Sequence, residues 1–432
     1  MKWSEENIVP VAAKLDQNRY ISAVKNAMIL TIPFLIVGSV FLIINAFPIP
    51  AYTEFMTTNP VGIQIRTWFG YATAATFDTV SIVTLAAVAY YLATSYKIDR
   101  IIAIGMALVS YFVVTPLSFP VAEVEGNVSG LSMQYMGSQG LFVAIIVGLL
   151  SVELLRFFLN SNLKIKMPDS VPAAVAKSFE SLIPAFFVLL VFLGLRILFE
   201  LLGVGSIHDV IAAVLTEPLS RISGTLIGSV VITFMIHLLW SFGIHGAAIT
   251  WAVMQPVLNI MLDANRIAFE NGEPIPNILT KEWFNIFVMM GGSGGTLVLV
   301  AMMAFLGKSD QLKQLGKLSL GPGIFNINEP VIFGTPIVMN PILIIPFILG
   351  PVIVTIMTYL AMEWGLVAQV VTIIPWSTPP IIGGFLITGG RISGAVLQIV
   401  NMIVLFAVYF PFFKIYDTQL LNEQRKVEAE VA

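Results

Sequence analysis

A series of long apolar segments constrains this chain more than any other feature of its sequence. Five segments in the first half reach the roughly 20 residues that a helix needs to cross the hydrocarbon core of a bilayer, and they lie at residues 27–47, 72–95, 101–119, 140–159 and 182–204. Over the whole chain 57% of residues are hydrophobic and 11% are charged, with a mean hydropathy of +0.90. This pattern excludes a soluble globular protein and predicts an all-α polytopic membrane protein.

The basic residues between these segments predict how the chain is oriented in the membrane. Segments that contain several of them alternate with segments that contain few, and the basic segments hold Lys2, Lys14, Arg19 and Lys25, then Lys97 and Arg100, then Arg156, Lys164, Lys166 and Lys177. The loops between hold only Arg66 or, at residues 120–139, no Lys or Arg. Because Lys and Arg concentrate on the cytoplasmic side, we expect a cytoplasmic N-terminus and a fifth span that ends outside.

The second half contains a segment in which a continuous transmembrane helix is not expected, Gly323–Pro351. It places Glu329, Asn326 and Asn328 in apolar sequence, and its prolines, which disfavour helix, are Pro330, Pro336, Pro341, Pro346 and Pro351. An ionisable group at membrane depth costs roughly 3 kcal/mol on insertion scales, and it persists mainly where it faces protein or a watery cavity. We therefore expect a ligand site on a re-entrant hairpin. The alternative is a proline-kinked helix in which Glu329 is paired or protonated.

A second candidate group surrounds His245, which lies between Gly243 and Gly246. This spacing indicates a backbone bend that presents an imidazole able to donate and accept hydrogen bonds, although a core histidine satisfied by a carbonyl is an alternative. Trp240 and Trp251 flank it and offer flat apolar surfaces suited to a sugar ring, or they anchor the chain at the membrane interface. No metal site is expected, because the spacing that histidine metal motifs use is absent.

Two further irregular segments follow. We interpret the GGSGG sequence at 291–295, inside an expected span at 283–306, as a site of close helix packing, with an unwound turn as the alternative. Residues 375–394 are expected to form another re-entrant hairpin, with Trp376 as a candidate stacking residue and Arg391 as a candidate charge partner. Lys308, Lys313 and Lys317 place the loop before Gly323 in the cytoplasm, and the acidic loop at 263–282 is expected outside. The result is about ten transmembrane helices plus two re-entrant hairpins, with both termini cytoplasmic.

The domain organisation follows from the contrast between regular and irregular halves. We expect a scaffold at residues 1–205, an interfacial amphipathic linker at 206–221, a substrate-binding domain at 222–416 and a charged cytoplasmic tail at 417–432. His208 in the linker is expected at the surface. The chain has no cysteine, so a thiolate nucleophile is excluded. No cofactor and no nucleic acid partner are expected, and no signal peptide with a cleavage site is recognisable at the N-terminus.

The segment FNINEPVIFGTPIVMNP at 325–341 resembles the signature of a known family, and GIHGA at 243–247 and PPIIGGFLITGGRISGA at 379–395 fit as well. The chain is similar along nearly its whole length to enzyme IIC, the sugar permease of the bacterial phosphotransferase system, in its lactose, cellobiose and chitobiose branch. The resemblance implies a homodimeric scaffold in the cytoplasmic membrane and a disaccharide substrate. It also implies a separate cytoplasmic B subunit, whose cysteine carries the phosphoryl group that this chain cannot carry.

The expected sugar ligands are Glu329, His245, Asn328, Asn326, Trp240, Trp251 and Trp376. Their donors and acceptors with one formal charge suit a neutral polyhydroxyl ligand, and Glu329 is also a candidate general base toward the sugar hydroxyl. The alternative function is a proton-coupled sugar symporter in which Glu329 titrates. An intramembrane enzyme is disfavoured because the sequence lacks a cysteine, a histidine metal motif and a G-x-S-x-G motif.

Overall fold

The computed structural model describes residues 18–45, 47, 49–120, 127–161, 165, 168, 172–335, 337 and 340–431. The expected topology signals at Lys2, Lys14, Lys164 and Lys166, and Pro336 of the signature segment, lie outside these residues. The chain divides into two compact units, and each is described by itself. One contains Ser39–Phe69 and Arg221–Ala432, and the other contains Lys14–Gly38 and Gly70–Ser220.

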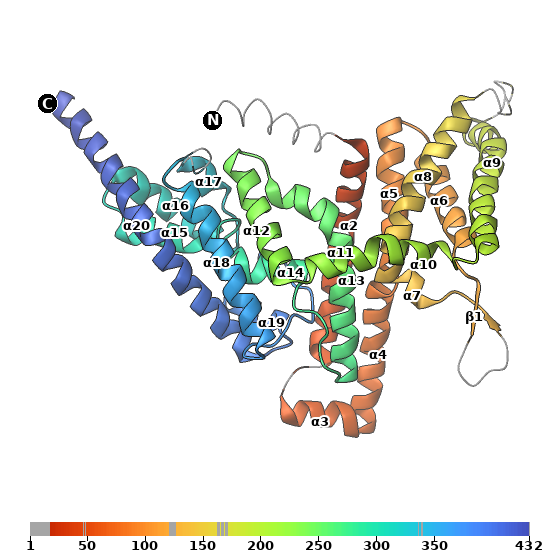
Figure 1. The fold of residues 1–432 in the computed structure, drawn as a ribbon, viewed down its shortest axis with the longest axis horizontal. Coiled ribbons are helices and arrows are strands. Elements are labelled where there is room, and N and C mark those ends of the chain that lie inside the picture. The colour runs from red at the N-terminus through yellow and green to blue at the C-terminus, as the bar shows by residue number, and fades with distance from the viewer. Residues whose placement is uncertain are drawn as a thin grey trace. The chain divides into compact units, whose positions relative to one another are not determined.

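Helices account for most of both units (Figure 1). The elements up to the linker are α2 (Arg19–Asn45), α3 (Pro50–Thr58), α4 (Pro60–Phe77), α5 (Val80–Tyr96), α6 (Arg100–Val114), β1 (Ser118–Pro120), β2 (Asn127–Ser129), α7 (Met133–Met136), η1 (Ser138–Gly140), α8 (Leu141–Asn160) and α9 (Ala173–Leu202). The two short strands pair antiparallel, with Ser118 opposite Ser129. The all-α prediction is therefore correct except for this small hairpin.

The linker and the second half continue the helical pattern with more interruptions. Their elements are α10 (Ile207–Ile211), η2 (Ala212–Thr216), α11 (Glu217–Ser223), α12 (Leu226–Ser241), α13 (Gly246–Asn271), α14 (Lys281–Trp283), η3 (Phe284–Val288), α15 (Leu297–Leu306), α16 (Asp310–Ile324), α17 (Glu329–Gly334), α18 (Ile344–Glu363), α19 (Ile382–Ile387) and α20 (Ile392–Val431). The segments η2 and η3 are π-helical.

Six of the described helices are long and apolar enough to cross a membrane, or seven if one bent pair counts as a single span. They are Arg19–Asn45, Pro60–Tyr96, Ser138–Asn160, Phe179–Leu202, Ile344–Glu363 and Ile392–Lys426. Shorter apolar helices lie at Arg100–Val114 and Leu297–Leu306. The polytopic helical class is thus confirmed, while ten spans and two hairpins remain a prediction.

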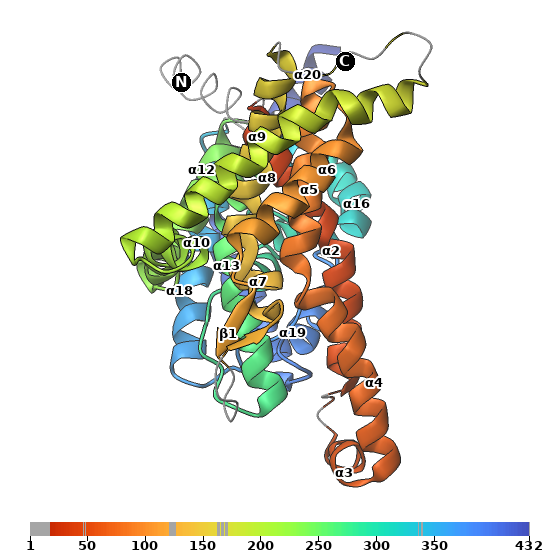
Figure 2. The same cartoon turned by 90° about the vertical axis from the view of Figure 1, so that its right-hand side faces the viewer.

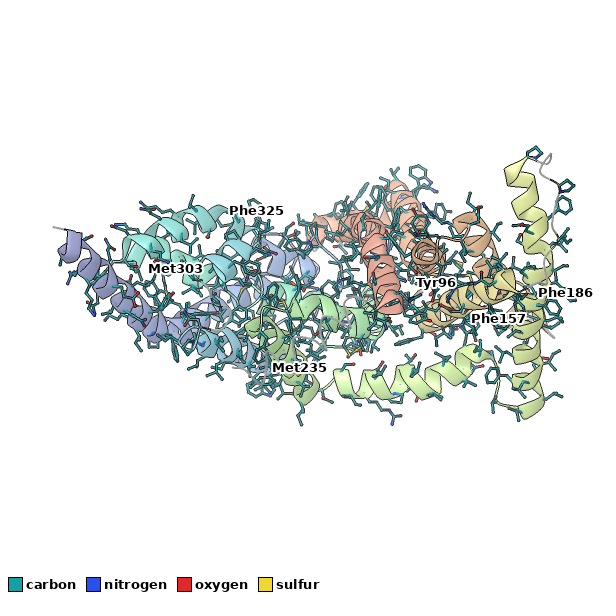
Figure 3. The ribbon with its side chains drawn as sticks, turned by 90° about the horizontal axis from the view of Figure 1, so that it is seen from above. Tyr96, Phe157, Phe186, Met235, Met303 and Phe325 are labelled. Atoms are coloured by element: carbon teal, nitrogen blue, oxygen red, sulfur yellow. The ribbon has the colours of Figure 1, made fainter. Side chains whose placement is uncertain are left out.

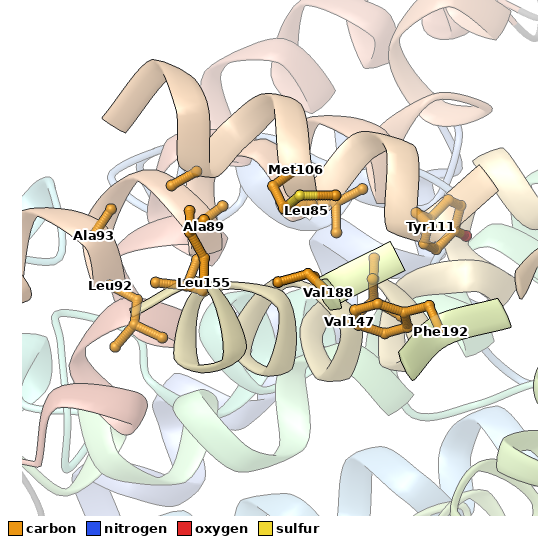
Figure 4. Packing of buried hydrophobic residues seen from close by; sticks show 14 of the residues in the cluster. Leu85, Ala89, Leu92, Ala93, Met106, Tyr111, Val147, Leu155, Val188 and Phe192 are labelled. Carbon is orange, nitrogen blue, oxygen red and sulfur yellow. The ribbon is translucent and has the colours of Figure 1, made fainter. Parts of the chain in front are cut away.

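The unit that contains α5, α6, α8 and α9 is a helical bundle with a continuous apolar core. These four helices pack side by side (Figure 2), and their facing sides bury Leu85, Leu92, Val147 and Phe192 completely (Figure 4). Small residues such as Ala89 and Ala107 alternate with these larger ones in the cluster. Interlocking of large and small side chains gives the close packing that this part of the chain needs to hold a fixed shape.

The linker differs from its prediction in the position of His208. The side chain of His208 is only 4% exposed, so the prediction of a surface histidine is wrong. Its Nε2 lies 3.0 Å from Thr115 Oγ1, and its ring stacks on Tyr135 with 4.2 Å between centroids. Apolar and aromatic surface from α6 and α7 covers the ring, a packing partner that a local reading of the linker does not reveal.

The second half contains both continuous and broken helices. Helix α13 is continuous through Pro256. The span expected at 283–306 is not one helix, because residues 289–296 separate η3 from α15. Helix α20 continues as one helix for 40 residues, through residues 417–431 of the expected charged tail, whose cytoplasmic location remains a prediction. Its Asp417 accepts hydrogen bonds from the backbone N–H groups of Lys308 and Ser309, which gives the extension a fixed place beside the start of α16.

Candidate functional site

The signature segment is broken, as its prolines predict. Helix α16 ends at Ile324, the six-residue α17 begins at Glu329, and the next long helix begins at Ile344. Glu329 is exposed, and within the described part of the chain its carboxylate has neither a hydrogen bond nor an ion pair. A carboxylate at the N-terminus of a helix is favoured by the local backbone dipoles. It is therefore held in place by its backbone while its oxygens stay available to a ligand.

Asn326 has a different role from the one expected of a ligand. It adopts a left-handed backbone conformation with φ of 62°, which asparagine tolerates better than most residues. Its Oδ1 accepts from Gly291 N at 2.7 Å, and its Nδ2 donates to the carbonyls of Trp376 and Thr378 at 2.7 and 3.0 Å. One buried amide thus joins three irregular segments of the chain, and both of its N–H donors are occupied.

Asn328 makes a second connection to the glycine-rich segment. Its Nδ2 donates to Ser293 O at 2.6 Å and to Thr296 Oγ1 at 3.0 Å. A Cβ atom added at Gly292 would lie 2.4 Å from Cγ of Asn328, so this close approach requires glycine. Gly291, Gly292, Gly294 and Gly295 all have positive φ. The segment is an unwound turn, and the interpretation as helix packing is wrong.

Polar residues of α20 hold the broken segments from the other side, and these were not predicted. Gln398 donates to Ile286 O and accepts from the N–H groups of Ile381 and Gly384. Asn401 donates to Phe287 O and Thr358 Oγ1, and Tyr409 donates to Gly294 O. In a lipid environment each unpaired backbone group costs several kcal/mol. The available signal was an Asn and a Gln three residues apart in an apolar span.

His245 is the N-cap of α13. Its Nδ1 accepts from Ala248 N at 3.1 Å, so in the neutral ring the proton resides on Nε2, which is then a donor. The ring is exposed and lies 4.5 Å from the ring of Trp240. The indole Nε1 of Trp240 is buried and has no hydrogen-bond partner among the described residues. Trp240 itself is only 4% exposed, so of this pair it is the imidazole that faces outward.

The other predicted residues divide between packing and exposure. Trp251 is 9% exposed and packs against Phe284 with 5.6 Å between ring centroids, so the structure places it in the core. Trp376 is 52% exposed and belongs to the segment that Asn326 holds. Arg391 is exposed, and it forms no ion pair with Glu329 in the part of the chain described. Among the described residues no group of three or more His, Asp or Glu side chains could hold a metal ion.

These features define a class of protein, a polytopic helical membrane protein whose polar groups gather where helices are interrupted. The sequence profile of the family "Phosphotransferase system, EIIC" matches residues 25–351. The chain belongs to this family, and it is a sugar transporter component of the cellobiose, lichenan and chitobiose type.

Three relatives illustrate the similarity. The cellobiose-specific EIIC component of Geobacillus stearothermophilus is 43% identical over 442 residues, which cover 98% of this chain and 96% of the relative. The lactose-specific EIICB component of Staphylococcus haemolyticus is 31% identical over 434 residues, which cover 98% of this chain and 71% of the relative. The crystal structure of the transporter ChbC, the IIC component of the N,N'-diacetylchitobiose-specific system, matches with a TM-score of 0.93 at 44% identity, covering 98% and 99% of the two chains.

Proposed function

We propose that this protein binds a disaccharide of the cellobiose, lactose or diacetylchitobiose type and carries it inward for phosphorylation by a cytoplasmic B subunit. The observation that carries the proposal is the contrast between Glu329 and its neighbours. The amide donors of Asn326 and Asn328 are occupied by backbone carbonyls and by the Thr296 hydroxyl, whereas Glu329 is exposed and unpaired among the described residues. The asparagines therefore position the segment, and Glu329 accepts hydrogen bonds from sugar hydroxyls.

His245 and the tryptophans complete the proposed site. Nε2–H of His245 donates to a sugar oxygen, and Trp240, which is only 4% exposed, supports the His245 ring from behind. Trp376, exposed beside the segment that Asn326 holds, offers a stacking surface. Donors, acceptors and flat apolar surfaces together suit a neutral sugar rather than an anion.

In the proposed phosphoryl transfer, the donor is a phosphocysteine on the B subunit. A sugar hydroxyl oxygen attacks the phosphorus atom, the new O–P bond forms as the S–P bond breaks, and the cysteine leaves as a thiolate. The hydroxyl proton passes to the Glu329 carboxylate, which acts as the general base. The phosphorylated sugar is an anion and does not return across the membrane. Fusion of EIIC and EIIB in one chain, as in the lactose-specific relative, supports such a partner.

The proposed arrangement in the membrane keeps both termini in the cytoplasm, with ten spans and two re-entrant hairpins. It assigns dimerisation to the scaffold of residues 1–205. Support for the dimer comes from the part of α9 at Phe179–Leu202. Only 17% of its apolar 18-residue stretch is buried, whereas 50% of the corresponding stretch of Ser138–Asn160 is buried. Phe186 on this helix is 58% exposed (Figure 3). Such a face needs a cover of lipid or of a second copy.

The direct test of the site is to measure, by calorimetry in detergent, the affinity of the purified protein and of its Glu329→Gln variant for a disaccharide. Loss of a charged hydrogen bond costs about 1.5–3 kcal/mol, so the affinity falls roughly 10- to 100-fold while the melting temperature is unchanged. Glu273→Gln, which neutralises an exposed carboxylate after α13, is the matched control and leaves affinity unaltered. Full affinity of a folded Glu329→Gln variant would remove Glu329 from the site.

A further inference from the structure

Helix α16 leads from the predicted cytoplasmic side to the proposed sugar site, and packing against α15 determines which of its faces is buried. One face, which includes Leu312, Gly316 and Ser319, is buried. A Cβ atom added at Gly316 would lie 2.3 Å from Ala304 N, so α16 and α15 are in close contact there. At about 1.5 Å per residue its 15 residues span roughly 22 Å. The opposite face is therefore presented outward along this whole distance.

That outward face carries a stripe that mixes basic and apolar residues. We define the α16 stripe as Lys313, Gln314, Lys317, Leu318 and Phe325, all of them exposed. Leu318 is 75% exposed and Phe325 is 51% exposed, and Figure 3 labels Phe325 at the end of the helix. Exposed apolar side chains grouped beside charges are typical of protein interaction sites. Lys313 and Lys317 argue against a lipid cover, and α16 is not among the helices apolar enough to span a membrane.

The stripe ends at the candidate site. Phe325 immediately precedes Asn326, the residue that joins the three irregular segments. Glu329 lies three residues after Asn326. The opposite end of α16 is held as well, because Asp417 accepts from Ser309 N and Oγ at 2.9 Å and Gln424 donates to Asp310 at 2.8 Å. A surface fixed at both ends loses little conformational entropy when a partner docks on it.

We propose that the α16 stripe is the docking surface for the phosphorylated B subunit, an inference that rests on the proposed function. The two lysines, on a surface with no acidic residue among the five of the stripe, complement a partner that carries a doubly negative phosphoryl group. Phe325 and Leu318 supply the apolar contacts on which affinity mainly depends. A protein docked along the stripe lies next to the residues that hold the sugar, which is where a phosphoryl donor must be.

The first test measures sugar phosphorylation as a function of the concentration of a purified, phosphorylated B subunit of a cellobiose phosphotransferase system. In the double variant Lys313→Glu and Lys317→Glu, the apparent KM for the B subunit rises about tenfold or more, because two attractive charges become repulsive. Sugar affinity and the rate at saturating B subunit stay at the wild-type values. The control Lys97→Glu, an exposed lysine after α5, leaves KM unchanged.

The second test uses the absence of cysteine from the chain. A single cysteine at Leu318→Cys reacts with a water-soluble maleimide in inside-out vesicles, and the phosphorylated B subunit protects it. Failure of the cysteine to react would show that lipid or protein already covers the stripe, and reaction without protection would exclude docking there. An unchanged KM in the lysine variant would contradict the docking surface alone. Absence of any sugar phosphorylation with the wild-type chain would instead contradict the proposed function.

Discussion

Asn326 shows how one side chain organises the candidate site. It uses three hydrogen bonds to join its own segment to the one that contains Gly291 and to the one that contains Trp376 and Thr378. Its backbone has a left-handed conformation. Replacing it removes these bonds and leaves buried backbone groups unpaired, each at a cost of about 1–3 kcal/mol. Its contribution is therefore to the shape of the site, while Glu329 contributes chemistry.

This distinction predicts different effects of substitution at the two residues: Glu329→Gln lowers sugar affinity alone, whereas a change at Asn326 lowers both sugar affinity and the melting temperature. Asn326→Ala lowers the melting temperature in detergent and weakens sugar binding together, since the segments separate. Asn326→Gly, which tolerates the positive φ but cannot make the bonds, has the same effect and so separates bonding from backbone strain. Asn271→Ala, an exposed asparagine at the end of α13, serves as the control. Normal stability in the Gly variant would show that the three bonds are dispensable.

At the scale of elements, His208 connects the linker to its unit by packing against Tyr111, Tyr135 and Thr115, with Asp209 nearby. Burial lowers the pKa of His208 to about 4. Because the pKa is lower in the folded than in the unfolded state, the stability that neutral His208 provides is complete above pH 6.5 and is lost as the pH falls toward 4. At pH 5 the loss relative to pH 7.5 is about 2 kcal/mol.

The measurement is thermal unfolding of the wild type and of His208→Gln between pH 7.5 and 5. The wild-type melting temperature falls further over this range than that of the variant, whose side chain does not titrate. Parallel curves for the two proteins would mean that His208 is not buried in solution as the structure has it.

The elements that the sequence predicted well are those determined by local composition. The spans at 140–159 and 182–204 correspond to α8 and the greater part of α9, and the broken signature segment follows from its prolines. Errors arise where distant residues decide. The buried side of His208 depends on α6 and α7, and the unwound turn at Gly291–Gly295 depends on Asn328 and Tyr409. No local pattern contains these pairings.

The candidate site shows the same division. Glu329 and His245 are recognisable because a charge or an imidazole stands among apolar or glycine residues. That Asn326 and Asn328 bind backbone rather than remaining free could not be predicted, because asparagine in a polar motif suits either role. Gln398 and Asn401 were overlooked although their polarity in an apolar span is itself a signal of buried bonding.

In the function that we propose, the molecule as a whole is a carrier that supplies binding and positioning but no phosphoryl group. The chain has no cysteine to carry one, and its candidate general base is a single exposed carboxylate, Glu329, at the start of a short helix. Orientation of two reactants can contribute several kcal/mol to a reaction barrier without any covalent step on the chain itself. We therefore expect transfer to require the proposed B subunit.

Reconstitution of the purified chain in vesicles with radiolabelled cellobiose distinguishes a permease that works with a B subunit from a proton-coupled symporter. We expect slow downhill exchange by the chain alone, and phosphorylated sugar only after addition of a phosphorylated B subunit on the cytoplasmic side. Concentrative uptake of unmodified sugar driven by an imposed proton gradient, with no B subunit present, would exclude the proposed function and establish the symporter.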